Sequence, residues 1–516
     1  MKIDRCILLF FGMLAAFCTN AEAIISTPKV CDLQENEFER LRTDMNENSI
    51  PLVNLIVDTA LVRIRRFTEG EIEIADYQRR TDATTELVRY PCLLRYRGAS
   101  ATQYEKRSFA VKLLDETGEN LDACILGIRE ENSWILDAMA IDRARMRNRV
   151  CFDLWNKMSS TPYETNYGNR NGTEGVHVEL FINGTYHGLY CMSDKIDRKL
   201  LALKKAEVAN DSSVVVRGLL YKGVAWNERT DIHLLSYAES DVDTIAWNSW
   251  ELKYPEDYPS VDTWQPLMDL IDFCSETTED ETFQHEWQEH FYLGNLIDYV
   301  VLTCALNVGD NAYKNTYLST KDITKSRRFL LTPWDMDSSL GGLWNGGYSE
   351  NFTLPYSYNS IAPYNRLYAQ DMNGFRDEVK SRWSELASTI LSVENVYAAL
   401  DDYASLLCIS GAWQREYQRW NGNPVPLKEK ITEEVDYIKR WYQSNYNNLC
   451  RYFEMGTDIV QLAAEESNAV DAHLSATKKI DAIYDLSGRR VSSQFPVHSS
   501  QIQKGIYIQK GRKVVR

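Results

Sequence analysis

Two polar segments in the second half of the chain contain residues suited to phosphoryl transfer. In the first, Asp310 is followed five positions later by Asn315; the second holds Asp335 and Asp337 in a D-x-D pattern. Phosphoryl transfer needs a carboxylate that orients the attacking hydroxyl and hard oxygen ligands for the metal ions that bridge the phosphates. Asp310 suits the first task, and the other three suit the second. The alternative is structural, with these residues capping a helix and forming turns.

Three cations in the first half could bind phosphates. Arg97 opens a turn of small residues, and Lys106 and Lys112 follow it, the latter at the end of a short apolar run. A lysine on a strand after such a turn can pair with nucleotide phosphates. Lys112 is placed for this role, and Lys106 competes with it. The alternative is a solvated strand lysine.

The half of the chain that carries these cations is expected to form an antiparallel sheet. Short alternating or β-rich runs predict four strands, over 52–57, 71–74, 92–96 and 108–113. Asn183-Gly184, between two further runs at 176–182 and 185–190, is typical of a tight hairpin. Apolar residues at helical spacing predict a helix over 142–158.

Beyond residue 259 the pattern is mainly helical. Apolar residues recur with a helical period in four segments, over 261–274, 281–307, 375–407 and 427–453. Strands are expected at 316–318 and 328–331. A sheet part followed by a helical part predicts an α+β fold of two lobes, and ligand sites favour the cleft between lobes.

The composition is that of an acidic globular protein. The 516 residues include 57 basic and 74 acidic side chains, for a formal net charge of −17, and 44% are hydrophobic. Such a surface repels phosphate backbones, so nucleic acid is not expected as a partner. Residues 476–516 instead hold nine basic and two acidic residues, which indicates a separate C-terminal module.

The two ends of the chain are expected to serve export. Residues 1–23 have a basic start, an apolar run and an Ala-x-Ala site, as in a secretory signal peptide. No later stretch is apolar enough to span a bilayer, so no transmembrane segment is expected after cleavage. Residues 24–49 are polar and are interpreted as a linker or an exposed helix. Residues 456–479 are interpreted as a linker, and 480–516 as a small β module.

The chain resembles the CotH family, which is named for a spore-coat protein and regarded as a group of atypical kinases. The matching segments occur in the family's order. They are Arg97-Gly98-Ala99-Ser100 with Lys106-Arg107-Ser108-Phe109, Asn132-Ser133-Trp134-Ile135-Leu136 with Asp142 and Arg147-Asn148, Asn183-Gly184 with Gly188 and Tyr190, Asn307 with Asp310 and Asn315, and Trp334 with Asp335 and Asp337.

The resemblance implies a two-lobed, atypical protein-kinase-like fold over residues 50–455, made of an antiparallel sheet lobe and a helical lobe. It implies ATP as donor, magnesium or manganese as cofactor, and serine or threonine hydroxyls of proteins as acceptors. By position, the implied site residues are the catalytic Asp310, the metal ligands Asp335, Asn315 and Asp337, and the nucleotide-binding Arg97, Asn315 and Lys112 or Lys106. One departure is Asp194, which stands where a glutamate is usual in the family. The implied role of that glutamate is to orient the phosphate-binding lysine.

The C-terminal module resembles the secretion-sorting tails of exported Bacteroidetes proteins, on the segments 483–491 and 504–508. This resemblance implies contact with a secretion machinery and a periplasmic, cell-surface or extracellular destination. The alternative is a small accessory β domain.

Two functions fit these patterns. One is an exported kinase that phosphorylates envelope or secreted proteins; the other is a non-catalytic surface adhesin or scaffold that kept the fold, since a fold does not guarantee chemistry. The presence of Asp310, Asn315 and Asp335 together favours the kinase, whereas the scarcity of ATP outside the cytoplasm favours the scaffold.

Overall fold

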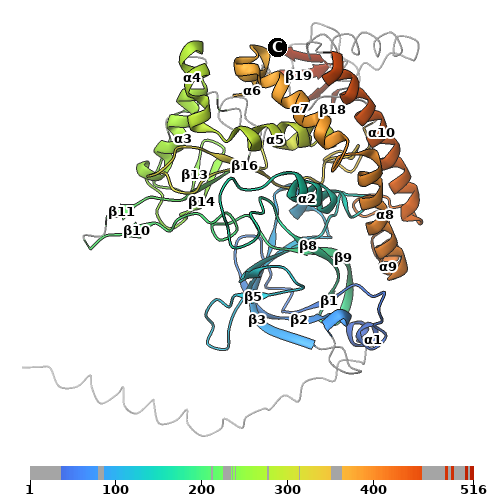
Figure 1. Cartoon of the computed structure of the whole chain (residues 1–516). Coiled ribbons are helices and arrows are strands. Elements are labelled where there is room, and N and C mark those ends of the chain that lie inside the picture. The colour runs from blue at the N-terminus through green and yellow to red at the C-terminus, as the bar shows by residue number, and fades with distance from the viewer. Residues whose placement is uncertain are drawn as a thin grey trace, which may run out of the picture.

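The computed structural model describes residues 36–455, apart from 80–86, 211–212, 225–233, 235, 239, 276–277, 313 and 350–362. Beyond residue 455 it describes only the backbone of four short strands. The predicted signal peptide at 1–23 and the predicted linker at 456–479 lie outside the described residues. The described part contains several sheets and ten α-helices, so the predicted mixed α+β class is confirmed (Figure 1).

The first half of the described chain forms a closed barrel of seven strands, in the order β1-β2-β3-β4-β7-β9-β8. Its strands are β1 (Leu52–Ile56), β2 (Thr68–Ala75), β3 (Leu87–Arg97), β4 (Ser108–Leu113), β7 (Ser133–Asp137), β8 (Gly175–Ile182) and β9 (Thr185–Ser193). Neighbouring strands are antiparallel except β1 and β8, whose parallel pairing closes the sheet. The expected antiparallel sheet lobe is therefore a barrel with one parallel pair.

Closure of the barrel follows from its inward-facing side chains. Val53, Leu55, Leu94, Val111 and Leu180 are all buried in one hydrophobic core. Alternate residues of each strand face this core, and a closed sheet buries them without leaving an unpaired edge.

Part of the predicted linker at 24–49 is structured. Helix α1 (Glu37–Thr43) begins after Asn36, whose side chain accepts a hydrogen bond from the backbone N–H of Glu39. The ring of Phe38 is buried against Phe181 of β8, with 5.4 Å between ring centroids. The described end of this segment thus packs on the barrel and does not act as a linker.

Two local predictions in this region hold. The hairpin between β8 and β9 turns at Asn183 and Gly184, whose φ angles are 50° and 78°, as a type I′ turn requires. Helix α2 (Arg147–Met158) lies within the helix predicted over 142–158. It begins later than predicted because the Asp142 carboxylate accepts from the backbone N–H groups of residues 146 and 147 and caps it.

A second sheet of five strands has the order β13-β14-β12-β15-β16. The strands are β12 (Leu219–Gly223), β13 (Ala246–Trp247), β14 (Trp250–Tyr254), β15 (Thr316–Thr320) and β16 (Leu330–Pro333). The last two were predicted and the first three were not. Two small hairpins pair β5 (Ala123–Cys124) with β6 (Glu130–Glu131) and β10 (Glu207–Val208) with β11 (Val214–Val215).

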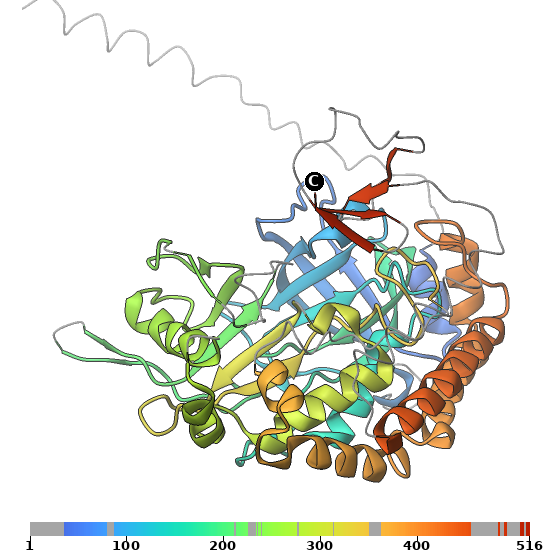
Figure 2. The ribbon, with the colours of Figure 1, turned by 90° about the horizontal axis from the view of Figure 1, so that it is seen from above.

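The second half supplies most of the helices. They are α3 (Val261–Cys274), α4 (Asp280–His290), α5 (Leu293–Leu306), α6 (Tyr364–Ala369), α7 (Phe375–Ala387), α8 (Val393–Ile409), α9 (Ala412–Trp420) and α10 (Ile431–Met455). Helix α3 has the predicted bounds, whereas 281–307 and 375–407 each divide into two helices. Figure 2 shows α8 to α10 along one flank of the molecule, opposite the hairpin of β10 and β11.

The barrel has its own hydrophobic core, while α2, the second sheet and the remaining helices share another. The described residues thus form two packed units, and a kinase-like arrangement of two lobes stays a prediction. No helix in the part of the chain that the structure describes is long and apolar enough to cross a membrane.

Near the C-terminus, four strands form a sheet in the order β18-β17-β19-β20. They are β17 (Ile483–Asp485), β18 (Arg490–Ser492), β19 (Ile506–Gln509) and β20 (Arg512–Val515). These strands agree with a β module at 480–516. A role for this module in secretion stays a prediction.

Candidate functional site

The floor of the candidate site is the outer face of β3, β4, β7 and β9. The register places Ala110, Ile135 and Ser193 in one cross-strand row and Asp137 beside Cys191 in the next. Because side chains alternate along a strand, these residues face away from the barrel core. A pocket of about 430 Å³ opens on this face, lined by Arg97, Ile135, Asp137, Met139, Asn148, Arg149, Phe152, Thr173, Cys191, Ser193, Trp334 and Asp335.

Asn148 of α2 holds two walls of the pocket together. Its side-chain amide N donates to Asp137 Oδ2 of β7 at 3.1 Å, and its Oδ1 accepts from the backbone N–H of Met336 at 3.0 Å. Asp137 is held further by Ser108, whose hydroxyl lies 3.3 Å from its Oδ1. Asn148 therefore fixes the segment around Asp335 against the barrel. In the sequence, Asn148 stood out only as part of the family motif Arg147-Asn148.

A second asparagine, Asn311, joins the two polar segments singled out in the sequence. Helix α5 ends at Asn307, whose φ of 49° turns the chain into the loop 307–315. The buried side-chain amide of Asn311 donates to the backbone oxygens of Asn315 at 2.8 Å and Trp334 at 3.0 Å. The Trp334 N–H in turn donates to the Asn315 oxygen at 2.8 Å. The loop 307–315 and the D-x-D segment thus form one rigid unit, and no pattern in the sequence indicated Asn311.

Asp335 and Asp337 are poorly compensated carboxylates. Asp335 has a φ of 57° and opens onto the pocket, and Asp337 is partly buried two residues further on. Neither makes a hydrogen bond or ion pair with another described residue. The protein packed around the pocket desolvates Asp335 and raises its pKa, and Asp137 adds to this. Burial raises the pKa of Asp337 well above its usual value, and Asp335 raises it further.

This set of oxygens fits a divalent metal. Asp335 and Asp337 repel one another, and the nearby charges of Lys222 and Arg97 offset only part of the effect on Asp335. Mg²⁺ is usually bound by one or two carboxylates together with phosphate oxygens and water. Within the described residues, no three carboxylate, histidine or cysteine groups are close enough to hold an ion by themselves. Asp335 and Asp337 would therefore share a metal with the phosphates of a substrate.

Asp310 stands in the short 3₁₀ turn Gly309–Ala312. Its Oδ2 lies 3.0 Å from Nζ of Lys314, and both side chains are partly exposed. It is close enough to Asp335 and Asp337 to raise the pKa of each. This carboxylate is partly exposed and therefore accessible, as orienting an acceptor hydroxyl requires.

Asn315 ends the same loop with a φ of 57°. Its side chain is buried and makes no hydrogen bond with the residues that the structure describes. Its backbone N–H donates to the oxygen of Gly223 at 2.9 Å, which ties the loop to β12. The structure therefore brings Asp310, Asn315 and Asp335 into one neighbourhood.

A family model described as "CotH kinase protein" matches residues 94–449. The chain belongs to this family. No curated protein matches the chain. The CotH segment begins inside β3 and ends inside α10, so it includes every residue that lines the pocket; β1 and β2, which complete the barrel, precede it.

Lys106, one of the two lysines that the CotH resemblance offered for nucleotide binding, lies away from the pocket. Its ammonium group is fully buried, 2.7 Å from Glu416 Oε1 of α9, and it donates to the backbone oxygen of Leu189 at 2.6 Å. Arg145 donates to the same glutamate oxygen at 2.7 Å. Lys106 is therefore part of a buried ion pair and is not one of the residues that line the pocket.

The two other predicted cations lie on the outer face of the barrel. Arg97 lines the pocket, and its guanidinium carbon is 5.6 Å from the ring centre of Trp334. Lys112 points to Phe67 in the loop between β1 and β2, with its Nζ 5.0 Å from the ring centre, and does not line the pocket.

A cation that sequence reasoning missed, Lys222, lies on the second sheet beside Trp334, a residue of the pocket wall, and is not itself one of the lining residues. Its Nζ lies 5.7 Å from the ring centre of Trp334 and 5.9 Å from that of Tyr317. Burial lowers the pKa of Lys222 to about 8, while the charge of Asp335 opposes that change. Its strand, β12, was not predicted, and a single lysine in a short apolar run carries no signal of its own.

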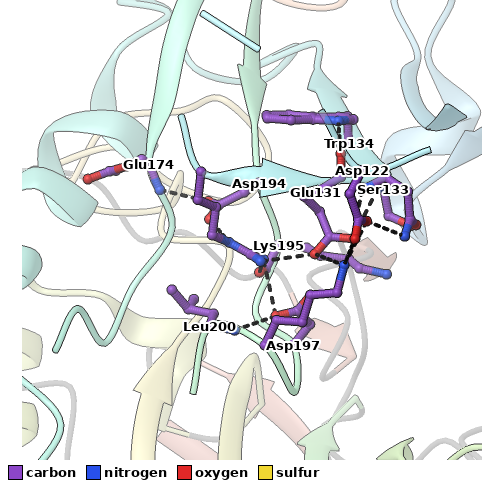
Figure 3. Close-up of polar contacts among 12 residues, drawn as sticks. Asp122, Glu131, Ser133, Trp134, Glu174, Asp194, Lys195, Asp197 and Leu200 are labelled. Atoms are coloured by element: carbon purple, nitrogen blue, oxygen red, sulfur yellow. Dashed lines mark hydrogen bonds and ion pairs between the residues drawn. The ribbon is translucent and has the colours of Figure 1, made fainter. Parts of the chain in front are cut away.

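Asp194 binds arginines and not a lysine. Its carboxylate accepts from Arg129 at 2.7 Å and from Arg170 at 2.9 Å, and from the backbone N–H of Glu174 at 2.8 Å. Asp194 lies directly after β9, in a cluster that also contains Glu131, Lys195 and Asp197 (Figure 3).

The cluster is completed by Arg129, which lies 2.9 Å from Glu131 and 3.1 Å from Asp197. Burial and a hydrogen bond to the Asp197 carboxylate raise the pKa of Glu131. These contacts fix the chain where it leaves the barrel. Asp194 therefore has a structural task here, and nothing in its contacts orients a phosphate-binding lysine.

Proposed function

We propose that this CotH family member transfers the terminal phosphoryl group of ATP to serine or threonine hydroxyls of proteins. The observation that carries the proposal is that the loop with Asp310 and Asn315 is hydrogen-bonded to the segment of Asp335, which lines a pocket together with Arg97. This combines an acceptor-orienting carboxylate, hard metal ligands and a phosphate-binding cation, which are the parts that phosphoryl transfer requires.

Each residue has a task that follows from its surroundings. Asp335, with Asp337 or the free amide of Asn315, would hold Mg²⁺ or Mn²⁺. When bound, the metal would neutralise charge on the phosphates. Asp310 accepts a hydrogen bond from the acceptor hydroxyl and orients its oxygen, and Lys314 lies beside that carboxylate. Arg97 contacts the phosphates from the barrel side.

The direct test is nucleotide binding and transfer by the mature chain, residues 24–516. We expect ATP to raise the melting temperature only when Mg²⁺ or Mn²⁺ is present, and label from γ-labelled ATP to appear on a serine-rich acceptor protein. The matched control is Asp335→Asn, which keeps the shape of the side chain and removes the charged ligand. A wild type that shows no metal-dependent shift with any nucleotide would favour the non-catalytic scaffold.

We also propose that the protein is exported and acts outside the cytoplasm. The support is the signal-like segment at 1–23 and the basic module at 480–516. Fractionation of cells that express the chain with and without 480–516 tests this. Equal delivery to the surface without the module would leave it no sorting role, and retention of the full chain in the cytoplasm would contradict export.

A further inference from the structure

Neither of the two lysines that the sequence predicted to bind phosphates lines the pocket. Lys106 is engaged by Glu416 in a buried ion pair, and Lys112 points to Phe67 outside the pocket lining. If the donor phosphates are bound by a lysine, that lysine must come from another element.

Lys222 is held rigidly next to the polar loop. The residue after it, Gly223, accepts a hydrogen bond from the Asn315 N–H at 2.9 Å. In the sheet, Lys222 is paired with Tyr317 of β15 and Glu251 of β14. Because cross-strand neighbours share a face, Glu251 could have neutralised it. The Glu251 carboxylate instead lies 3.5 Å from Lys253, so the Lys222 ammonium has no ion pair with any described carboxylate.

Two cations therefore approach Trp334 from different elements. Lys222 Nζ and the Arg97 guanidinium carbon lie 5.7 Å and 5.6 Å from the same ring centre, the first from β12 and the second from the end of β3. The following residue is Asp335. Neither cation makes a hydrogen bond with a described residue. Both side chains suit phosphate, Arg97 through its planar fork of donors and Lys222 through its compact charge.

We propose that Lys222, together with Arg97, binds the phosphates of the donor nucleotide, in the place that the sequence had assigned to Lys106 or Lys112. The assignment rests on the proposed phosphotransfer function and adds a specific contact to it. In this arrangement the second sheet supplies the lysine, the barrel supplies the arginine, and Asp335 supplies the metal ligand between them. Lys222 takes no part in making or breaking bonds; it positions the phosphates.

The test compares the affinities of ATP and adenosine for three variants of the mature chain, in the presence of Mg²⁺. Since a charge-assisted hydrogen bond to phosphate is lost, we expect Lys222→Met to weaken ATP binding at least about 10-fold and to leave adenosine binding unchanged. Lys222→Arg should restore most of the ATP affinity. Lys112→Met is the matched control and should bind ATP as the wild type does.

The outcomes separate this assignment from the proposed function. If the wild type binds no ATP, the proposed function fails. If the wild type binds ATP and Lys222→Met binds it equally well, or if Lys112→Met shows the loss instead, the assignment of Lys222 is overturned. An equal loss of ATP and adenosine affinity in Lys222→Met would show a structural role and would also overturn it. Circular dichroism and thermal unfolding of Lys222→Arg provide the check that the fold is intact.

Discussion

Two of the places in the described structure where a lysine and an arginine come close together differ in whether a carboxylate joins them by ion pairs. At the contact of the barrel with α9, Lys106 and Arg145 share the carboxylate of Glu416, and all three side chains are fully buried. Beside the pocket, Lys222 and Arg97 flank Trp334 and make no ion pair with a carboxylate that the structure describes. The first group of charges is complete and holds the structure together, whereas the second is incomplete and suits a ligand.

The complete site depends on a close approach between α9 and β9. A Cβ atom on Gly188 would lie 2.6 Å from Nε1 of Trp420 and 2.8 Å from Oε2 of Glu416, and its φ is 133°. Only glycine permits this approach. The glycine of the family motif therefore serves the buried ion pair and not the pocket.

The largest effect is expected from breaking the complete site. Glu416→Ala would leave Lys106 and Arg145 buried without a counter-charge, so we expect the free energy of unfolding to fall by about 3–5 kcal/mol. Urea denaturation followed by circular dichroism measures it. A loss below about 1 kcal/mol would mean that the pair is not the main link between the barrel and α9.

Asp335→Ala should affect the pocket in the opposite way. Removing one of several repelling carboxylates should leave the free energy of unfolding unchanged or slightly higher, while metal-dependent ATP binding and phosphate transfer fall at least about 100-fold because a hard ligand is lost. Urea unfolding and a transfer assay on the same preparation measure both. A large loss of stability would place Asp335 with the structural charges.

Asp310→Asn should separate catalysis from binding within the pocket. We expect an ATP affinity near that of the wild type and a transfer rate lower on the order of 100-fold, because the acceptor hydroxyl is no longer oriented by a carboxylate. Single-turnover kinetics with saturating ATP measures the rate. Unchanged activity would remove Asp310 from the mechanism.

A smaller, pH-dependent effect is expected beside the complete site. Burial lowers the pKa of His187 to about 4, and the charge of Lys106 contributes. The pKa of this histidine is about 6.5 in the unfolded chain. As the pH falls from about 6.5 to about 4, the unfolded chain takes up a proton that the folded chain does not, so the free energy of unfolding decreases over this range. For this partly buried ring the loss is on the order of 2 kcal/mol. In His187→Gln, unfolding measured from pH 7 to pH 4 should show a shallower slope; an identical slope would contradict this origin.

The smallest effect is expected from removing 480–516. We expect the free energy of unfolding of the remainder to change by less than about 0.5 kcal/mol, since few contacts cross a polar linker. Urea unfolding of the shortened and full chains measures the difference. A loss of several kcal/mol, or of a single cooperative transition, would show that these strands stabilise the main fold.

Features that depend on near neighbours could be predicted from the sequence. The hairpin at Asn183-Gly184, the bounds of α3 and the grouping of Asp310 with Asn315 all depend on contacts across a few residues. Barrel closure could not be predicted in this way, because it requires β1 to pair with β8, which lies far along the chain. The division of 281–307 into two helices was also missed, since the apolar period continues through the break at Phe291.

The sequence by itself determined which residue types could transfer phosphate and that two loops would carry them. Only the tertiary structure decided which cation is free to serve them. Lys106, Lys112 and Lys222 are chemically identical, and no local pattern separates them. Their surroundings differ: Glu416, 310 positions away in the chain, forms an ion pair with Lys106, the ring of Phe67 lies next to Lys112, and Lys222 lies near Asp335 without an ion pair to any carboxylate that the structure describes.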